Sequence, residues 1–232
     1  MIKHLPNAIT CLNLFCGCLG IVFAFQGNLV FASYAIVIAA IFDFFDGMVA
    51  RLLKAYSEIG KELDSLADMV SFGVLPSIII YHLFLQAPQI GSFSVYLNFS
   101  AFLIAIFSAL RLAKFNIDIR QSENFIGLPT PANAILIASL PMIISQSNFF
   151  LNSYILNPFF LFSFSLGMSI LLVTEIPLFS LKFKNLKISD NLFRYILVFS
   201  ALILIVLFKF AAVPIVIFLY FILSLIQFRS IR

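Results

Sequence analysis

Long apolar runs separated by short polar segments make up most of the chain. A helix of about 20 apolar residues crosses the hydrocarbon core of a bilayer. The runs predict eight such helices, with approximate ranges 8–27, 30–52, 64–85, 94–115, 131–148, 155–178, 193–209 and 211–228. The last two runs are separated only by a short segment around Lys209 and Pro214, so six spans followed by a re-entrant or disordered pair is the alternative. The pattern predicts an all-α, polytopic membrane protein.

Composition agrees with this prediction. The 232 residues are 62% hydrophobic and only 10% charged, which is typical of a helical membrane protein. We expect a catalytic core of six helices in residues 1–180, and a basic loop with two further helices in residues 181–232. Cys11, Cys16 and Cys18 are expected to pack as small apolar side chains of the first span. The N-terminus is expected to be retained, because no clear cleavage site follows the first apolar run.

The positions of the basic residues predict the orientation. If the N-terminus is cytoplasmic, thirteen of the fourteen Lys and Arg residues fall on the cytoplasmic side, and only Lys209 falls outside. Cytoplasmic loops of membrane proteins are enriched in Lys and Arg. Both termini, and the polar stretch 43–68, are therefore predicted to face the cytoplasm.

Four aspartates in residues 43–68 stand out in this apolar chain. Asp43 and Asp46 are three residues apart and Asp64 and Asp68 are four apart, so each pair shares one face of a helix. A charge inside a bilayer segment costs about 2.5–3.5 kcal/mol unless it is paired, solvated or bound to metal. Clustered carboxylate oxygens suit Mg²⁺ or Mn²⁺. The four aspartates are therefore predicted to bind a divalent metal.

Neighbouring residues point to a diphosphate. Gly47 and Gly60 have no side chain where a backbone or a phosphate must come close, and Arg51 offers a fork of donors for phosphate oxygens. The alternative is an ordinary charged loop between two helices, but loops rarely keep such regular acidic spacing.

The pattern Asp43-x2-Asp46-Gly47-x2-Ala50-Arg51-x8-Gly60-x3-Asp64-x3-Asp68 resembles the complete signature of the CDP-alcohol phosphotransferases. The resemblance implies a membrane-embedded enzyme that moves a phosphatidyl or phospho-alcohol group from a CDP-linked donor to an alcohol and releases CMP. We expect Asp43, Asp46 and Asp64 to bind two divalent ions, Mn²⁺ or Mg²⁺. Asp68 is expected to complete the metal site and to act as general base. The donor, CDP-diacylglycerol, is expected to contact Gly47, Ala50, Arg51, Gly60, Asn7 and Thr10.

Stretches on both sides of this motif resemble the serine-accepting branch of the family, the membrane-bound CDP-diacylglycerol–serine O-phosphatidyltransferases. The resemblance covers roughly residues 5–135 and includes the stretches 5–17, 68–76, 111–116 and 125–131. It implies L-serine as the acceptor, membrane lipids as partners, a homodimer, and a location in the bacterial cytoplasmic membrane. Arg111 and Lys114 are expected to hold the serine carboxylate, although Lys114 stands where Arg is more usual. Thr130, between two prolines, is expected to start a helix.

Two alternatives stay open. The acceptor could be glycerol phosphate, an inositol compound or an amino-alcohol, because the family signature does not specify the alcohol. In a different class, a cation transporter could line an ion path with these acids. Arg51 and the small residues Gly47, Ala50 and Gly60 argue against a transporter, since an ion path does not require a phosphate-binding site.

Overall fold

The computed structural model describes residues 4–88, 94–118, 125–146, 149–179 and 188–229. In this part of the chain the fold is all-α apart from one pair of two-residue strands. The elements are α1 (Leu5–Phe25), α2 (Leu29–Leu52), α3 (Glu58–Asp68), a π-helical segment (Met69–Val74), α4 (Leu75–Gln86), α5 (Ser94–Asn98), a 3₁₀ turn (Phe99–Phe102), α6 (Leu103–Ile117), β1 (Phe125–Ile126), α7 (Thr130–Ile144), α8 (Phe149–Ile155), α9 (Pro158–Val173), β2 (Pro177–Leu178), α10 (Ile188–Phe208), a 3₁₀ turn (Lys209–Ala211) and α11 (Ala212–Arg229).

Several helices are long and apolar enough to cross a membrane, as the sequence predicts. Among the described residues there are five, or six if the bent pair α8–α9 counts as one span. They are Leu5–Phe25, Leu29–Leu52, Glu58–Gln86, Val95–Ile117 and Asn191–Phe228, the last of which includes the turn between α10 and α11. The chain is therefore an integral membrane protein. The count of eight crossings and the side on which the termini lie remain predictions.

The third and sixth predicted helices differ from the structure in shape. The third starts at Glu58 and not near residue 64, because Ser57 caps an amphipathic turn that carries too few apolar residues to be read as a span; the Ser57 side chain accepts a hydrogen bond from the Gly60 N–H. The predicted helix 155–178 corresponds to α9, which is shorter and follows a separate short helix, α8; the two are bent by 64° relative to each other. The bend lies at Asn157 and Pro158, where a proline starts the second helix.

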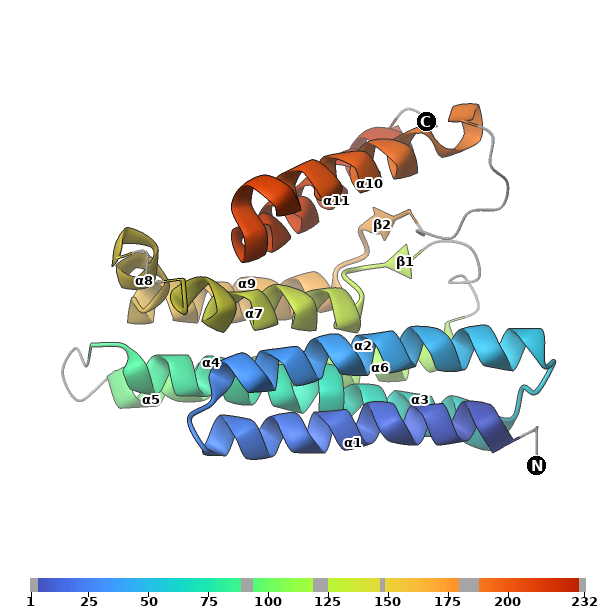
Figure 1. Cartoon of the computed structure of the whole chain (residues 1–232), viewed down its shortest axis with the longest axis horizontal. Coiled ribbons are helices and arrows are strands. Elements are labelled where there is room, and N and C mark those ends of the chain that lie inside the picture. The colour runs from blue at the N-terminus through green and yellow to red at the C-terminus, as the bar shows by residue number, and fades with distance from the viewer. Residues whose placement is uncertain (1–3, 89–93, 119–124, 147–148, 180–187, 230–232) are drawn as a thin grey trace.

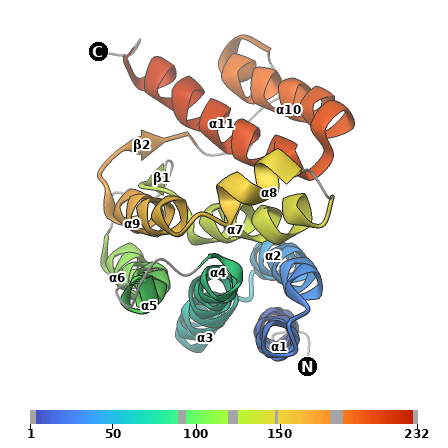
Figure 2. The same cartoon turned by 90° about the vertical axis from the view of Figure 1, so that its left-hand side faces the viewer.

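The helices form layers, as Figure 1 and the end-on view in Figure 2 show. The segments α1, α2, α3–α4 and α5–α6 lie roughly parallel and form the lower part of the molecule in Figure 1. Above them lie α7, α8 and α9, and the hairpin of α10 and α11 covers these helices from the other side. The largest group of buried apolar side chains fills the space between the first two layers, with Ile36, Phe72 and Ile137 among its members.

Close packing of α1 on the π-helical segment positions the acidic end of α3. A Cβ added at Gly17 would collide with the Ser71 side chain and would lie 3.0 Å from the Ser71 Cα. The Ser71 hydroxyl donates a hydrogen bond of 3.0 Å to the main-chain carbonyl of Asn13. A π-helical turn is frequent at functional sites, and this one follows Asp68 directly.

A small strand pair, which the sequence pattern does not predict, joins the segment before α7 to the segment after α9. Strands β1 and β2 are antiparallel, with Phe125 opposite Leu178 and Ile126 opposite Pro177. The Gly127 N–H donates to the Ile176 carbonyl (2.9 Å). Gly127 has a φ of +74°, and an added Cβ would lie 2.7 Å from the Thr174 carbonyl oxygen, so a larger residue would disturb this junction.

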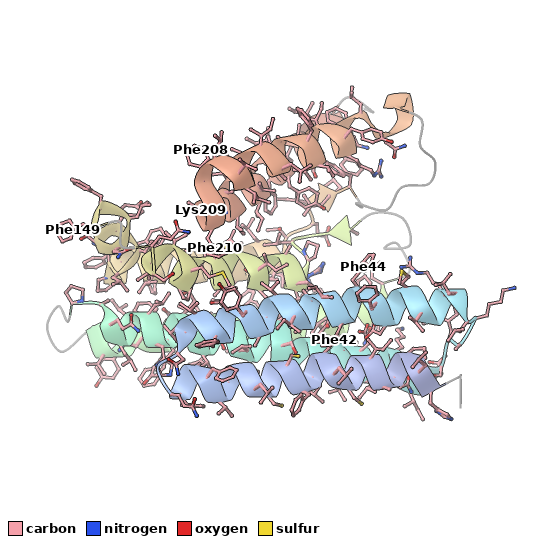
Figure 3. All side chains as sticks on the ribbon, in the orientation of Figure 1. Phe42, Phe44, Phe149, Phe208, Lys209 and Phe210 are labelled. Atoms are coloured by element: carbon pink, nitrogen blue, oxygen red, sulfur yellow. The ribbon has the colours of Figure 1, made fainter. Side chains whose placement is uncertain are left out.

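The C-terminal hairpin turns at Lys209, which has a φ of +51°. Figure 3 places Lys209 and Phe210 at this turn, and Phe210 packs against the main core. At the other end of the hairpin, Leu197, Tyr220 and Leu223 form a separate cluster with Leu178 and Phe179 of the β2 region. The hairpin is therefore attached to the core both at its tip and near β2.

The close contact between α1 and the π-helical segment should make the protein's stability sensitive to a larger side chain at Gly17. Overpacking costs about 1–3 kcal/mol, so Gly17→Ala should lower the melting temperature in detergent or nanodiscs. The matched control is Gly167→Ala in α9, where an added Cβ meets no atom within 4 Å. This control should keep or raise stability, because alanine is favoured in helices by about 0.5–1 kcal/mol. Equal shifts in the two variants would contradict the packing described here.

Candidate active site

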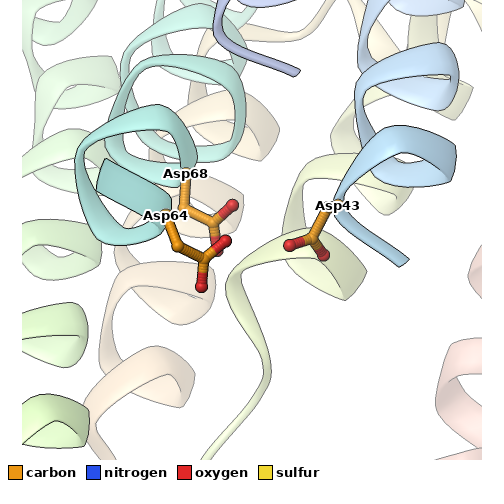
Figure 4. Close-up of side chains that lie close together, drawn as sticks. All are labelled: Asp43, Asp64 and Asp68. Atoms are coloured by element: carbon orange, nitrogen blue, oxygen red, sulfur yellow. The ribbon is translucent and has the colours of Figure 1, made fainter. Parts of the chain in front are cut away.

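Three carboxylates from two helices converge near the ends of α2 and α3. One carboxylate oxygen from each of Asp43, Asp64 and Asp68 lies within 4.8 Å of the other two. Figure 4 shows Asp43 on α2 facing Asp64 and Asp68 on α3. The helical spacing predicted that each pair of acids shares a face and that all four meet at one point. The structure brings Asp43, Asp64 and Asp68 together, and Asp46 is not part of this group.

Helix α1 supplies hydrogen bonds to two acids of the motif. The Thr10 hydroxyl donates to Asp46 Oδ2 (2.7 Å), and the Asn13 side-chain amide donates to Asp68 Oδ1 (3.2 Å). Both acids are buried. Because each bond engages one oxygen, it orients the carboxylate and leaves the other oxygen for a further partner. Thr10 therefore contacts the acidic site itself, and Asn13, which was not counted among the donor-binding residues, does so too.

The donor set fits a divalent cation. Asp64 Oδ1 is buried and has no hydrogen-bond partner in the described part of the chain, which is costly unless an ion or water satisfies it. Three nearby carboxylates supply hard oxygen ligands of the kind that Mg²⁺ and Mn²⁺ prefer. Asp43, Asp64 and Asp68 would hold the ion. Asp46, predicted as a fourth ligand, is one turn from Asp43 on α2 and is held by Thr10.

A cavity of about 220 Å³ lies on one side of the acids. It is lined by residues of α1, α2, α3 and the connection between α2 and α3: Pro6, Asn7, Thr10, Asp46, Gly47, Ala50, Ala55, Tyr56, Ser57, Gly60, Lys61 and Asp64. We call it the first pocket. Five of the six residues predicted to bind the donor line it. Arg51, the sixth, is exposed, and its Nε–H donates to the Gly47 carbonyl (2.9 Å).

The two motif glycines differ in their surroundings. At Gly47 an added Cβ would meet no protein atom within 4 Å, so the absent side chain leaves open space in the first pocket. At Gly60 an added Cβ would lie 2.9 Å from both Asn7 Oδ1 and Ser57 Oγ. Gly47 thus leaves room for a ligand, whereas Gly60 lets α3 approach Asn7 of α1 and leaves room for the capping side chain of Ser57.

A second cavity, of about 260 Å³, lies on the other side of the acids. We call it the second pocket; it is lined by Asp43, Lys61, Asp64, Ser65, Asp68, Arg111, Leu112, Phe115, Asn116, Pro129, Thr130 and Pro131. Arg111 is only 6% exposed, so its cation is directed into the protein near the acids. Lys114 is exposed and lines only a smaller neighbouring cavity that Arg111 also borders. The structure therefore places Arg111, but not Lys114, in the pocket with the carboxylates.

Asp64 and Lys61 line both pockets. Lys61 Nζ donates to the Asn116 carbonyl (2.9 Å), and the Asn116 side-chain amide donates to Ser65 Oγ (2.9 Å), so these bonds tie α3 to the end of α6. Lys61, Ser65 and Asn116 are not among the predicted site residues. The stretch 111–116 carries part of the family resemblance, but nothing in its spacing shows that Asn116 meets α3. Thr130 starts α7 as expected, and it also forms part of the pocket wall.

The chain is similar in sequence to known proteins. A family model described as CDP-alcohol phosphatidyltransferase matches residues 3–174. A CDP-diacylglycerol–serine O-phosphatidyltransferase of Helicobacter pylori (strain ATCC 700392 / 26695) is 35% identical over 200 residues, which are 85% of this chain and 80% of the relative. One of Bacillus subtilis (strain 168) is 37% identical over 175 residues, 75% of this chain and 89% of the relative. An archaetidylserine synthase of Methanothermobacter thermautotrophicus is 36% identical over 138 residues, 58% of this chain and 56% of the relative.

The carboxylate cluster predicts a metal-binding phenotype. Asp64→Asn should weaken Mn²⁺ binding roughly ten- to a hundredfold, the equivalent of one lost charge-assisted contact. Electron paramagnetic resonance of free Mn²⁺ measures the affinity. Glu62→Gln is the matched control, because Glu62 is an exposed acid on the same helix that lines neither pocket. Equal weakening in both variants would mean that Mn²⁺ binds to surface charge and not to the cluster.

Proposed function

Since the chain belongs to the CDP-alcohol phosphatidyltransferase family, we propose that it transfers the phosphatidyl group of CDP-diacylglycerol to L-serine, which yields phosphatidylserine and CMP. The observation that carries this proposal is the position of the carboxylate cluster between two pockets of different character. Asp64 borders both. A group transferred from a ligand in one pocket to a ligand in the other would pass the cluster.

The first pocket suits the nucleotide end of the donor. Gly47 and Ala50 have little or no side chain, so they leave space for a ligand along α2. Asn7 and Ser57 offer polar groups to it. Arg51 lies beside Gly47, where its guanidinium is available to a phosphate. The diphosphate would then reach the carboxylates, and the diacylglycerol end would remain in the membrane.

The second pocket suits serine. Free serine carries a carboxylate, an ammonium group and a hydroxyl. Arg111 offers a buried guanidinium to the carboxylate, and Lys114 is the nearest further cation along α6. Asp68 lines the same pocket, so it can accept the hydroxyl proton if the hydroxyl is within hydrogen-bond reach. The serine oxygen forms a bond to the phosphorus that carries the diacylglycerol, the bond to CMP breaks, and the proton passes to Asp68.

Two divalent ions, Mn²⁺ or Mg²⁺, are the proposed cofactors, held by Asp43, Asp46, Asp64 and Asp68. When bound, they would neutralise the diphosphate and the charge that builds on the departing CMP. Thr10 and Asn13 keep two of these carboxylates oriented. In this scheme Asp68 is both a ligand and the general base.

We further propose that the site faces the cytoplasm of a bacterial inner membrane and that the protein acts as a homodimer, as the charge distribution and the family resemblance respectively imply. Glu58 starts α3 next to the first pocket. A cysteine placed there in a cysteine-free background should react with an impermeant thiol reagent only from the cytoplasmic side.

Light scattering of the purified protein in detergent should give the mass of two chains; the mass of one would reject the dimer.

The activity itself is tested by incubating purified protein with CDP-diacylglycerol, labelled serine and Mn²⁺ or Mg²⁺. CMP and labelled phosphatidylserine should appear together, and excess chelator should abolish both products. Competition with glycerol phosphate, inositol and ethanolamine tests the acceptor. Faster transfer to any of these alcohols than to serine would reject serine as the acceptor, and ion flux without nucleotide turnover would favour a transporter.

The roles of Asp68 and Asp64 can be separated. Asp68→Asn keeps an oxygen that can accept from Asn13 but cannot take the serine proton, so kcat should fall by about 10²–10⁴. Asp64→Asn should instead lose activity through metal affinity, and excess Mn²⁺ should restore part of it. The measurement is a metal titration of both variants. If excess metal restores Asp68→Asn equally well, Asp68 is mainly a ligand.

Arg111→Gln tests the acceptor site. Loss of a charge-assisted hydrogen bond of about 1.5–3 kcal/mol corresponds to a roughly ten- to hundredfold rise in KM for serine. The KM for CDP-diacylglycerol should change little. Lys114→Gln, three residues further along α6, should have a smaller effect because Lys114 is exposed. An equal rise for both substrates in Arg111→Gln would move Arg111 to the donor site.

A further inference from the structure

One wall of the second pocket depends on the strand pair. Pro129, Thr130 and Pro131 form this wall, and β1 lies directly before them in the chain. Strand β1 pairs with β2. The Leu128 N–H donates to the Leu171 carbonyl (3.0 Å), so the main chain between β1 and Thr130 is also anchored to α9. The position of the wall therefore depends on where β2 and the end of α9 lie.

The C-terminal hairpin holds the end of β2. Phe179 follows β2 directly and is fully buried. The Tyr220 hydroxyl on α11 donates a 2.7 Å hydrogen bond to the Phe179 main-chain carbonyl. The two rings also pack edge to face with centroids 5.1 Å apart, and the Arg194 guanidinium lies 5.8 Å from the Phe179 ring centroid. Three contacts from the hairpin thus converge on one residue.

The hairpin also packs next to the second pocket on the side of Leu128. Ile217 and Phe221 of α11 pack against the cluster of Leu128, Leu136 and Met168, and Leu128 immediately precedes the pocket wall. Thr130 in this wall lines the same pocket as Arg111 and Asp68. The match to the family model ends at residue 174, before the hairpin begins. A segment outside the matched region therefore stands against the proposed acceptor pocket.

We propose that Tyr220 is a positioning residue for the acceptor pocket. Its hydrogen bond to Phe179 fixes the β1–β2 pair, and through that pair it sets the place of Thr130 opposite Arg111. The proposal rests on the proposed function, because that function assigns the second pocket to serine. It predicts an effect on serine binding in particular, since the first pocket is formed by α1, α2, α3 and the α2–α3 connection and includes no residue held by this contact.

The test is Tyr220→Phe, which removes only the hydroxyl and keeps the ring. Loss of one neutral hydrogen bond should raise the KM for serine about three- to tenfold. The kcat and the KM for CDP-diacylglycerol should stay within about twofold of the wild-type values. The matched control is Tyr154→Phe, at an exposed tyrosine on α8 in a different part of the molecule. This control should leave all three parameters unchanged.

Hydrogen exchange provides a readout that does not depend on activity. In Tyr220→Phe the amides of Gly127 and Leu128 should exchange faster than in the wild type, while amides of α1 and α2 should not change. If Tyr220→Phe does not fold, Arg194→Gln tests the proposal in its place. This substitution weakens the contact with the Phe179 ring and should raise the KM for serine by about twofold.

An unchanged KM for serine in the variant that folds, or an equal change for both substrates, would overturn the proposal. Failure of the proposed function looks different. In that case the wild-type protein would form no phosphatidylserine at all, and the comparison of KM values could not be made. A wild-type enzyme that is active with serine, together with a Tyr220→Phe variant that is kinetically identical to it, would reject only the role of Tyr220.

Discussion

The repulsion among three clustered carboxylates is the constraint on which the rest of this structure depends. Asp43, Asp64 and Asp68 place oxygens within 4.8 Å of one another. Two unit charges at that distance repel by about 3–4 kcal/mol even at an effective dielectric constant of about 20. Such a cluster is stable only if cations and hydrogen-bond donors compensate it. Helix α1 supplies donors through Thr10 and Asn13, and Gly17 allows α1 to approach closely enough for Asn13 to reach Asp68.

The division of the site into two pockets follows from the same arrangement. Asp64 and Lys61 line both pockets, so the acids lie where the two pockets meet. Small residues line the first pocket along α2, and the guanidinium of Arg111 lies in the second. The bonds of Lys61 and Asn116 fasten α3 to α6, and the strand pair β1–β2 fastens α7 to α9. Each wall of the site is thus held by contacts between helices that are distant in the sequence.

The sequence predicts features that depend on neighbouring residues, but not features that depend on contacts between residues distant in the chain. The convergence of Asp43, Asp64 and Asp68 was predictable, because helical spacing sets which side chains share a face. The apolar runs located the long helices, but not the bend at Pro158 or the start of α3 at Glu58, where amphipathic character and capping outweigh mean hydropathy. The contact of Asn116 with α3 and the two-residue strands depend on tertiary packing alone. The separation of Arg111 from Lys114 could not be predicted from their spacing, because residues three apart lie on the same side of a helix. Arg111 is buried and Lys114 is exposed because other segments cover only the first of them.

The most direct test of this account is a crystal structure with Mn²⁺ and CDP-diacylglycerol bound, with data collected for the anomalous scattering of manganese. The account predicts an anomalous peak among the oxygens of Asp43, Asp64 and Asp68, with the donor diphosphate next to it and the cytidine in the first pocket. A peak at another site, or a diphosphate bound away from these aspartates, would contradict it.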